Sequence, residues 1–288
     1  MLSILIRIGS IAIIASLAVL LSLSSAPAIA QELSANDDPA VQRVEPFQVF
    51  DNLYYVGARW VAAWLLETDE GLILFDTLYG DLTDIVIDNI RKLGKDPDDI
   101  RYVIVTHAHF DHIGGAKRMQ DEFGAVVLMT EPDWVMVDQP PEYREYPKPR
   151  RHLSVSNNST LNLGRARLSF YETPGHTPGV LSTQFTVYDN GYPHTAFMFG
   201  GAGLNFDGVE RTQMYIKSVQ NMQTLPGIEV NIPNHAEAGD VFARYERLQN
   251  RQQGDPHPFV DPESFTAWLA QLLVMAEAKL VEEQAAAN

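Results

Sequence analysis

Four side chains that can bind a metal ion lie within one short stretch of this chain, the segment Thr106–His112 with the sequence THAHFDH. A short apolar run comes directly before the segment and predicts a buried strand, so the segment leaves the edge of a sheet as a loop. His107 and His109 can point the same way toward one ion. Asp111 and His112, further round the turn, can serve a second ion. The alternative is a polar loop that holds three histidines by chance, which is disfavoured because the whole chain has only 8 His.

Two further histidines lie in comparable settings. His176 stands in the segment Thr173–Gly179, TPGHTPG, where two Pro-Gly turns fix the backbone around one imidazole, as a rigid metal ligand requires. His235 follows a predicted strand within the sequence PNHA. The remaining three histidines are expected to be ordinary surface residues: His152, His194 and His257.

The composition limits both the chemistry and the partners. The chain has 288 residues, and 45% of them are hydrophobic, which is enough for a globular core. It contains no cysteine, so any metal must be held by His and carboxylate side chains. The formal net charge of -16 makes an extended phosphate-binding face improbable, and no nucleic-acid partner is expected.

The amino terminus is interpreted as a secretory signal peptide over residues 1–30. One positive charge precedes an uncharged run, residues 8–23, and a small-residue segment that ends at Ala30 matches an A-x-A cleavage site. An uncleaved membrane anchor is the alternative, although the run is shorter than a spanning helix needs. We therefore expect a periplasmic or secreted protein without stable membrane association, whose mature chain, residues 31–288, is a single domain.

Hydrophobic periodicity predicts a mixed α/β fold in two similar halves, after an irregular lead-in over residues 31–46. In the first half we expect strands over 53–56, 61–67, 72–75, 101–105 and 125–129, helices over 81–93 and 117–122, and a long loop over 131–151. In the second half we expect strands over 160–163, 166–172, 181–187, 196–199 and 229–232, and helices over 213–224 and from residues 240 and 262 onward. Two mixed β-layers with helices outside them account for this order.

The H-x-H-x-D-H motif, the later G-H-T-P-G around His176 and a final histidine after a strand together resemble the metallo-β-lactamase superfamily. The resemblance runs from about Leu53 to Gln249. It implies a four-layered αββα sandwich with one or two zinc ions at the edge between the sheets. Asp76, at the end of a predicted strand, matches an aspartate that lies behind the metal ligands in that family, with a simple strand-terminal turn as the alternative.

The ligand set narrows the resemblance. Many members carry an aspartate that bridges both metals after a strand, whereas the matching strand here leads into Gly200–Gly203 without a carboxylate. The chain therefore most resembles the third subclass of metallo-β-lactamases. That subclass implies a first zinc on His107, His109 and His176 and a second on Asp111, His112 and His235. Gly201 stands where several of those enzymes have a serine, which implies one polar contact fewer near the second zinc.

The expected activity is that of an exported dizinc hydrolase that opens the ring of a β-lactam. Zinc lowers the pKa of bound water to about 7, so a hydroxide can attack the carbonyl while Asp111 orients it. No G-x-S-x-G motif is present, which disfavours a covalent serine mechanism. A zinc-dependent hydrolase of a lactone, another cyclic amide or an ester is the second hypothesis. A non-catalytic periplasmic zinc-binding protein is the third.

Substrate contacts are expected from two segments, Trp60–Trp64 and Asp133–Lys148, the second of which contains Trp134, Tyr143 and Tyr146. The alternative for both segments is a surface loop packed on the core. Asn205 either polarises a carbonyl or ends a turn. The candidate substrate contacts are Trp60, Asn205 and Gly201.

Overall fold

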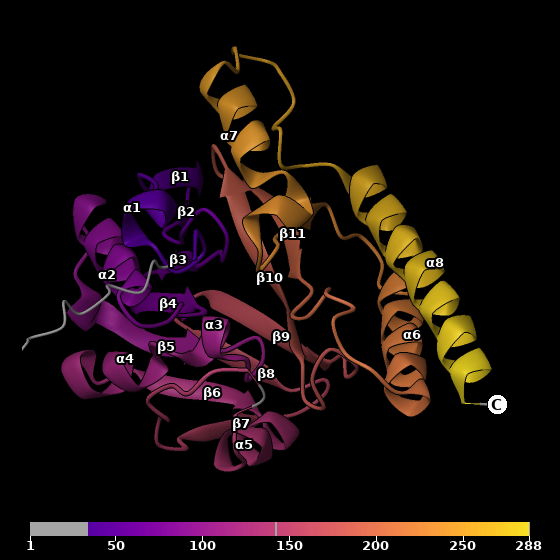
Figure 1. Ribbon diagram of the computed structural model, residues 1–288. Helices are drawn as coiled ribbons and strands as arrows, with labels where there is room; N and C mark the ends of the chain where they lie inside the picture. The colour runs from indigo at the N-terminus through magenta and orange to yellow at the C-terminus, as the bar shows by residue number, and fades with distance from the viewer. Residues whose placement is uncertain (1–33, 142, 288) are drawn as a thin grey trace, which may run out of the picture. The chain divides into compact units, whose positions relative to one another are not determined.

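The computed structural model describes residues 34–141 and 143–287 (Figure 1). The predicted signal peptide and its cleavage site lie outside the described residues, so export stays a prediction.

The first sheet contains seven strands that follow one another in chain order. Neighbours from β1 to β4 are antiparallel, and neighbours from β4 to β7 are parallel. The strands are β1 Phe47–Phe50, β2 Leu53–Tyr55, β3 Trp64–Thr68, β4 Gly71–Phe75, β5 Ile100–Ile104, β6 Val126–Thr130 and β7 Leu153–Val155. Parallel strands bring their carboxyl ends to one edge, and the segment Thr106–His112 leaves β5 at this edge.

The second sheet contains five strands in the order β12-β11-β10-β9-β8. They are β8 Thr160–Leu163, β9 Ala166–Glu172, β10 Leu181–Asp189, β11 Tyr192–Met198 and β12 Val230–Asn231. His176 lies in the turn from β9 to β10, and His235 follows β12. The backbone N–H of Leu181 donates to the carbonyl of Thr106 at 2.8 Å, which joins the sheets beside the segment that carries His107.

Successive side chains of each strand point to opposite faces of its sheet, and this alternation divides the core into three layers. In β4, Leu72 and Leu74 pack with the helices outside the first sheet, whereas Phe75 packs between the sheets. In β11, Met198 faces the space between the sheets and Phe197 packs under the outer helices. The fold is therefore the expected four-layered αββα sandwich.

Helices cover both outer faces of the sandwich (Figure 1). The first face is packed by α2 Leu82–Lys92, α4 Ala116–Phe123 and α5 Glu131–Asp138. The second face is packed by α6 Val209–Gln223 and α8 Pro262–Ala286. The remaining helices are α1 Pro39–Gln42, α3 Phe110–Ile113, α7 Val241–Gln249 and the 3-10 turns η1 Pro97–Asp99 and η2 Ala236–Gly239.

The structure corrects the sequence interpretation in two segments. The first half of the expected long loop over 131–151 is α5, because Pro132 fits the first turn of a helix and Trp134 and Val137 provide a buried face. The expected irregular lead-in over 31–46 contains α1, where the Asp38 side chain accepts a hydrogen bond from the N–H of Ala40 at 2.8 Å. The strands β1 and β7 were also not expected.

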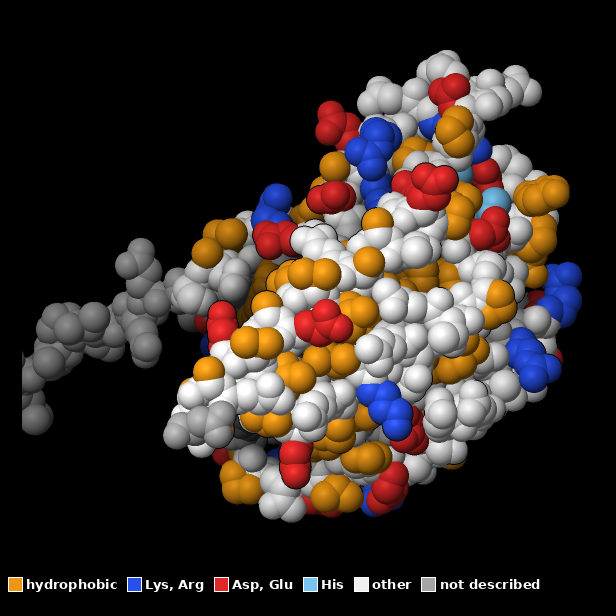
Figure 2. Space-filling view, turned by 90° about the vertical axis from the view of Figure 1, so that its right-hand side faces the viewer, with side chains coloured by type: hydrophobic (Ala, Val, Ile, Leu, Met, Phe, Trp, Pro, Cys, Tyr) orange, Lys and Arg blue, Asp and Glu red, His pale blue; other side chains and the backbone are white. Residues whose placement is uncertain are grey.

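Helix α8 is apolar on most of its surface. Phe265, Leu269 and Leu272 are buried against the second sheet and α6, whereas Val274 and Val281 are 66% and 65% exposed. Figure 2 shows hydrophobic side chains scattered over the outer face on this side, with few Lys or Arg among them. By length and composition α8 is long and apolar enough to cross a membrane, as core helices of soluble proteins also are.

Candidate metal centre

Three buried imidazoles form a first cluster at the edge between the sheets. His107 and His109 lie just after β5, and His176 comes from the turn between β9 and β10. Their ring centroids are 4.5 to 4.8 Å apart. The Nε2 atoms of His107 and His176 are 3.1 Å apart, so the structure brings together the side chains that the sequence assigned to a first metal.

Backbone carbonyls fix the orientation of two of these rings. The Nδ1 atom of His107 lies 2.8 Å from the carbonyl of Gly200, and Nδ1 of His176 lies 2.8 Å from that of Gly203. A carbonyl only accepts, so Nδ1 donates in each ring and each Nε2 carries a lone pair. Two lone pairs that face each other at 3.1 Å repel unless a cation lies between them. The donor set therefore fits a metal ion.

A second cluster adjoins the first and consists of Asp111, His112 and His235. Asp111 Oδ2 lies 3.4 Å from His112 Nε2 and 3.5 Å from His235 Nε2, and the two Nε2 atoms are 3.2 Å apart. Tetrahedral zinc with bonds of about 2.0–2.1 Å spaces its ligand atoms about 3.3–3.4 Å apart. The three measured distances fit this spacing. The ring of His107 lies 4.1 Å from that of His112, so the two clusters share one wall.

Asp76 ties the metal-binding segment to the end of β4. Its Oδ2 accepts hydrogen bonds from His112 Nδ1 and from the Thr106 hydroxyl, both at 2.8 Å, and its Oδ1 accepts from the N–H of Thr106. Asp76 and Leu78 have φ of 58° and 57°, in the left-handed region, which Asp tolerates but Leu rarely adopts. The next residue, Thr77, donates through its hydroxyl to the carbonyl of His112 at 2.8 Å. Asp76 is therefore both a turn residue and a hydrogen-bond partner of a metal-ligand candidate.

Glycines after β11 let the chain approach His176 closely. A Cβ atom at Gly201 would lie 2.9 Å from the Cβ of His176 and 2.9 Å from a methyl carbon of Val180. A Cβ atom at Gly203 would lie 2.5 Å from Asn205 Oδ1. The structure thus places Gly201 against the first cluster, whereas the resemblance implied a position near the second zinc. At both positions a side chain would collide with its neighbours, so the chain runs this close to His176 only because these residues have no Cβ atom.

Two buried side chains at the site were not recognised as functional from the sequence. Asn234 donates through Nδ2 to the carbonyl of Gly200 at 2.8 Å, and so holds the same oxygen that orients His107. Asp133, the first residue of a segment expected to form a wall of the pocket, is instead fully buried in α5 and accepts a hydrogen bond from the N–H of Ala108. The only signal in the sequence that either residue belongs to the site was the position of Asn234 directly before His235.

Burial controls the charge of the cluster. It lowers the pKa of His176 to about 3 and the pKa values of His109 and His235 to about 4, so these imidazoles are neutral and able to bind a metal at neutral pH. Burial opposes the ionisation of Asp111, but the neighbouring imidazoles outweigh it and hold the pKa of this carboxyl below its usual range. Burial also opposes protonation of His112, yet two adjacent carboxylates raise its pKa to about 10. A metal at the second cluster has to displace this proton.

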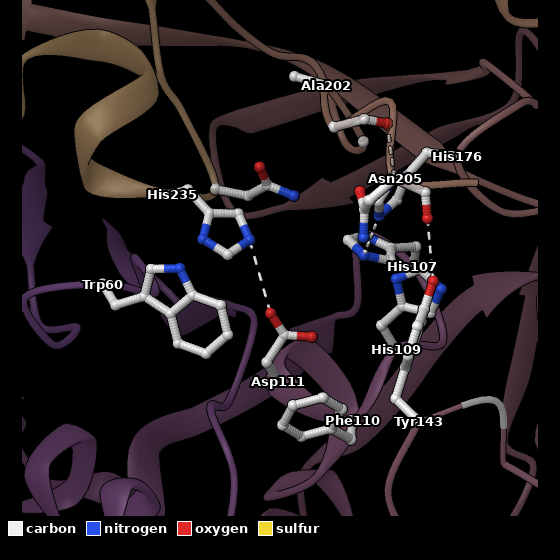
Figure 3. A pocket seen from close by; sticks show the side chains of 13 residues that line it. Trp60, His107, His109, Phe110, Asp111, Tyr143, His176, Ala202, Asn205 and His235 are labelled. Atoms are coloured by element: carbon white, nitrogen blue, oxygen red, sulfur yellow. Dashed lines mark hydrogen bonds and ion pairs between the residues drawn. The ribbon is translucent and has the colours of Figure 1, made fainter. Parts of the chain in front are cut away.

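A pocket of about 370 Å³ opens over both clusters. Figure 3 shows Trp60 on one side, beside His235, and Tyr143 on the opposite side, beside His109. The ring centroids are 5.3 Å apart in the first pair and 5.0 Å apart in the second. The hydroxyl of Tyr143 donates to the carbonyl of Asn205 at 3.0 Å.

The pocket contains only part of the expected substrate contacts. Trp60, Tyr143, Gly201 and Asn205 line it, together with Phe110 and Ala202. Trp64 is fully buried and donates to the carbonyl of Pro233, and Trp134 is 2% exposed and donates to the carbonyl of Leu153. Tyr146 packs partly buried against the core. Trp64 on β3 and Trp134 on α5 are therefore core residues, whereas Tyr146 lies in the loop after α5 and donates through its hydroxyl to the carbonyl of Ala108 at 3.3 Å.

One histidine was assigned wrongly. His257 is 6% exposed, stacks on Phe50 with ring centroids 4.2 Å apart and donates through Nε2 to the carbonyl of Val49 at 2.9 Å. It is a core residue. His194 is largely buried and contacts Glu229 at 3.1 Å, and His152 is exposed as expected.

Comparisons with known proteins agree with this geometry. The sequence profile of the metallo-beta-lactamase superfamily matches residues 56–189. The chain is similar to the crystal structure of BJP-1, a subclass B3 metallo-beta-lactamase of Bradyrhizobium japonicum. The two are 28% identical, the TM-score is 0.77, and the match covers 86% of this chain and 97% of that one.

Two curated relatives are named for activities other than that of BJP-1. The probable metallo-hydrolase YqgX of Bacillus subtilis (strain 168) is 25% identical over 201 residues, which cover 67% of this chain and 92% of the relative. The N-acyl homoserine lactonase of Bacillus thuringiensis is 28% identical over 143 residues, which cover 41% of this chain and 55% of the relative. Hydrolysis is the activity that these names share, whereas the two substrates that they name, a β-lactam and an N-acyl homoserine lactone, differ.

Proposed function

This chain belongs to the metallo-β-lactamase superfamily, and we propose that it is an exported dizinc hydrolase that opens the β-lactam ring. One observation carries the proposal. Two adjoining ligand clusters, made only of His and Asp, lie under one open pocket. The similarity to a subclass B3 metallo-beta-lactamase over 86% of the chain supports the choice of substrate.

The chain offers three donors to each of two metals. His107, His109 and His176 would hold the first, and Asp111, His112 and His235 the second. When bound, zinc lowers the pKa of water and polarises a carbonyl oxygen. Three protein ligands per ion leave coordination positions open, as a catalytic site requires and a structural site does not. This favours an enzyme over a storage protein.

Asp111 is the residue best placed to handle a proton. Its Oδ2 faces the two imidazoles of the second cluster, and its other oxygen points into the pocket (Figure 3). That oxygen can accept a hydrogen bond from the attacking water and then receive its proton. The low pKa of Asp111 keeps the carboxylate ionised for this role at neutral pH.

The walls of the pocket would hold and orient the substrate. Trp60, Phe110 and Tyr143 give three aromatic faces that exclude water and contact the apolar parts of a bicyclic ring. The side chain of Asn205 lies at the rim on the side of His176 and can donate to a carbonyl oxygen (Figure 3).

A cyclic ester is the second candidate, and the charge of the pocket favours it. Among the described residues that line the pocket, none is Lys or Arg. A β-lactam carries a carboxylate, which would find no cationic side chain here and would depend on the metals. The nearby Arg211 donates instead to the carbonyls of Gly175 and His176. A lactone without a carboxylate makes no such demand, and one curated relative is named a lactonase.

Turnover assays on the zinc-loaded mature chain distinguish the candidates. We expect hydrolysis of nitrocefin and of penicillins, abolished by a chelator and unaffected by inhibitors that react with a serine nucleophile. A sample that holds two zinc ions, leaves every β-lactam intact and opens N-acyl lactones would replace the first candidate by the second. A zinc-loaded sample that is inactive on both would favour a binding protein.

Export is proposed on the sequence alone. The mature chain should begin after Ala30 and fractionate with soluble periplasmic or secreted proteins. Amino-terminal sequencing of the purified protein tests this, and an intact membrane-bound chain that starts at Met1 would contradict it.

A further inference from the structure

Asp133 is a buried carboxylate that the reaction described above does not use. It lies in the first turn of α5 and is 0% exposed. Its Oδ2 accepts hydrogen bonds from the N–H of Ala108 at 2.8 Å and from the hydroxyl of Thr177 at 2.9 Å. Its Oδ1 accepts from the N–H of Gly179 at 2.8 Å. Both oxygens are therefore engaged by donors from two other segments.

These donors lie directly beside the ligands of the first cluster. Ala108 stands between His107 and His109, and Thr177 follows His176. One carboxylate thus joins the loop after β5 to the turn between β9 and β10, which are far apart in the sequence. Both segments supply imidazoles to the first cluster.

The surroundings of Asp133 are built for this contact. A Cβ atom at Gly179 would lie 2.6 Å from the backbone nitrogen of Asp133 and 2.8 Å from its Oδ1, and would also collide with the hydroxyl of Thr130. Only glycine lets the N–H at this position reach the carboxylate. The same Thr130 hydroxyl donates to the carbonyl of Gly179, which fixes the turn from its other side.

The burial of this carboxylate is costly. A carboxylate removed from water is retained only where hydrogen bonds compensate, and here three neutral donors do so. Burial raises the pKa of Asp133 to about 6, which leaves it mainly ionised at neutral pH. The three imidazoles of the first cluster carry no negative charge. Asp133 therefore supplies a negative charge near this cluster, from the far side of the backbone segments that carry the imidazoles.

We propose that Asp133 is a positioning residue for the first metal, which it serves by holding the loop of His107 and His109 against the turn of His176. The proposal rests on the metal centre of the proposed function but on no particular substrate. It acts on the segments that carry the ligands, since its carboxylate accepts hydrogen bonds from the N–H groups of Ala108 and Gly179 and from the hydroxyl of Thr177. Asp76 is its counterpart at the second cluster, where it contacts His112 directly.

Zinc affinity measured one site at a time tests the proposal. The His235→Ala variant retains the three donors of the first cluster, and the His176→Ala variant retains those of the second. Competition with a chromophoric chelator gives one zinc dissociation constant in each background. Adding Asp133→Asn is expected to weaken zinc binding about tenfold or more in the His235→Ala background. In the His176→Ala background it should change the dissociation constant by less than about twofold.

Two further variants make the result decisive. Thr177→Val removes one of the three donors with little change of shape, and should weaken the first site in the same direction but less than Asp133→Asn does. It also provides the test if the Asp133 variant does not fold. Asp76→Asn is the matched control, and its larger loss is expected in the His176→Ala background.

The outcomes are distinct. Equal losses in both backgrounds would show that Asp133 only stabilises the fold, and an unchanged first site in both the Asp133 and Thr177 variants would overturn the proposal. The spectrum of cobalt in the His235→Ala protein should also change with Asp133→Asn if the three imidazoles move. No step of the experiment measures turnover, so failure to hydrolyse β-lactams would leave the result intact.

Discussion

Replacing Gly201 by serine tests whether this position requires glycine because a side chain would collide with His176. A Cβ atom at this position would lie 2.9 Å from the Cβ of His176, 3.1 Å from its Cδ2 and 2.9 Å from a methyl carbon of Val180. Carbon atoms prefer separations of about 3.5–4.0 Å, so the ring of His176 or the loop after β11 must move by several tenths of an ångström. The polar contact that a serine would add is therefore obtained only by shifting His176 or the loop that packs against it.

The size of the effect follows from the cost of overpacking. Extra methylene groups in a packed site typically cost about 1–3 kcal/mol. If this cost falls on the metal-bound state, zinc binding at the first cluster weakens by about 5-fold to 150-fold. We expect Gly201→Ser to weaken zinc binding in the His235→Ala background by a factor in this range, and to lower turnover of any substrate at limiting zinc.

Ala202→Ser is the control for this prediction. Ala202 lies in the same loop, lines the same pocket and already has a Cβ atom, so its variant adds a hydroxyl without the close approach. It should keep the zinc affinity of the parent. If Gly201→Ser binds zinc as tightly as the parent and raises turnover, the steric reasoning is wrong.

Three further predictions concern the same centre. His176→Ala is expected to lower bound zinc from about two ions per chain to about one, measured by atomic absorption, and an unchanged content would remove His176 from the ligand set. Asp111→Asn should lower kcat far more than it changes KM, because its contact with the attacking water strengthens in the transition state, and steady-state kinetics that show equal activity would reassign its role. In the metal-free protein, the free energy of unfolding should fall as the pH drops from about 6.5 toward about 4. The unfolded chain then binds protons that burial keeps off His109, His176 and His235, at up to ~1.4 kcal/mol per pH unit for each group. Urea titrations at several pH values check this, and stability that stays flat would contradict it.

The parts of the fold that could be predicted from the sequence are those with a local signal. The apolar run of β5 and the histidines after it are adjacent in the chain, so their strand-to-loop geometry follows from a short stretch of sequence. The two Pro-Gly turns around His176 are equally local. Periodicity also placed α2 and the strands β8, β9 and β10 close to their observed bounds, whereas β11 begins at Tyr192, four residues before the expected start.

The errors arose where contacts between residues far apart in the sequence decide the position of a side chain. Helix α5 was missed because Pro132 suggested a break, although proline is tolerated in a first helical turn. His257 looked like a surface residue between two prolines, but Phe50 from the start of the domain covers its ring. The importance of Asp133 was also invisible, because its three partners come from residues that are 25 to 46 positions away in the chain.

The hydrogen bonds behind the first cluster bear on how the protein exchanges its metal. The carbonyls of Gly200 and Gly203 hold the rings of His107 and His176 without help from a metal, so little conformational entropy is lost when an ion arrives. A zinc finger, by contrast, unfolds when its ion is removed. Here the protein should stay folded when a chelator removes its ion and should rebind the ion without refolding. It should also accept other divalent metals with the same imidazole geometry. The metal carried in the cell is then decided by supply as much as by the protein.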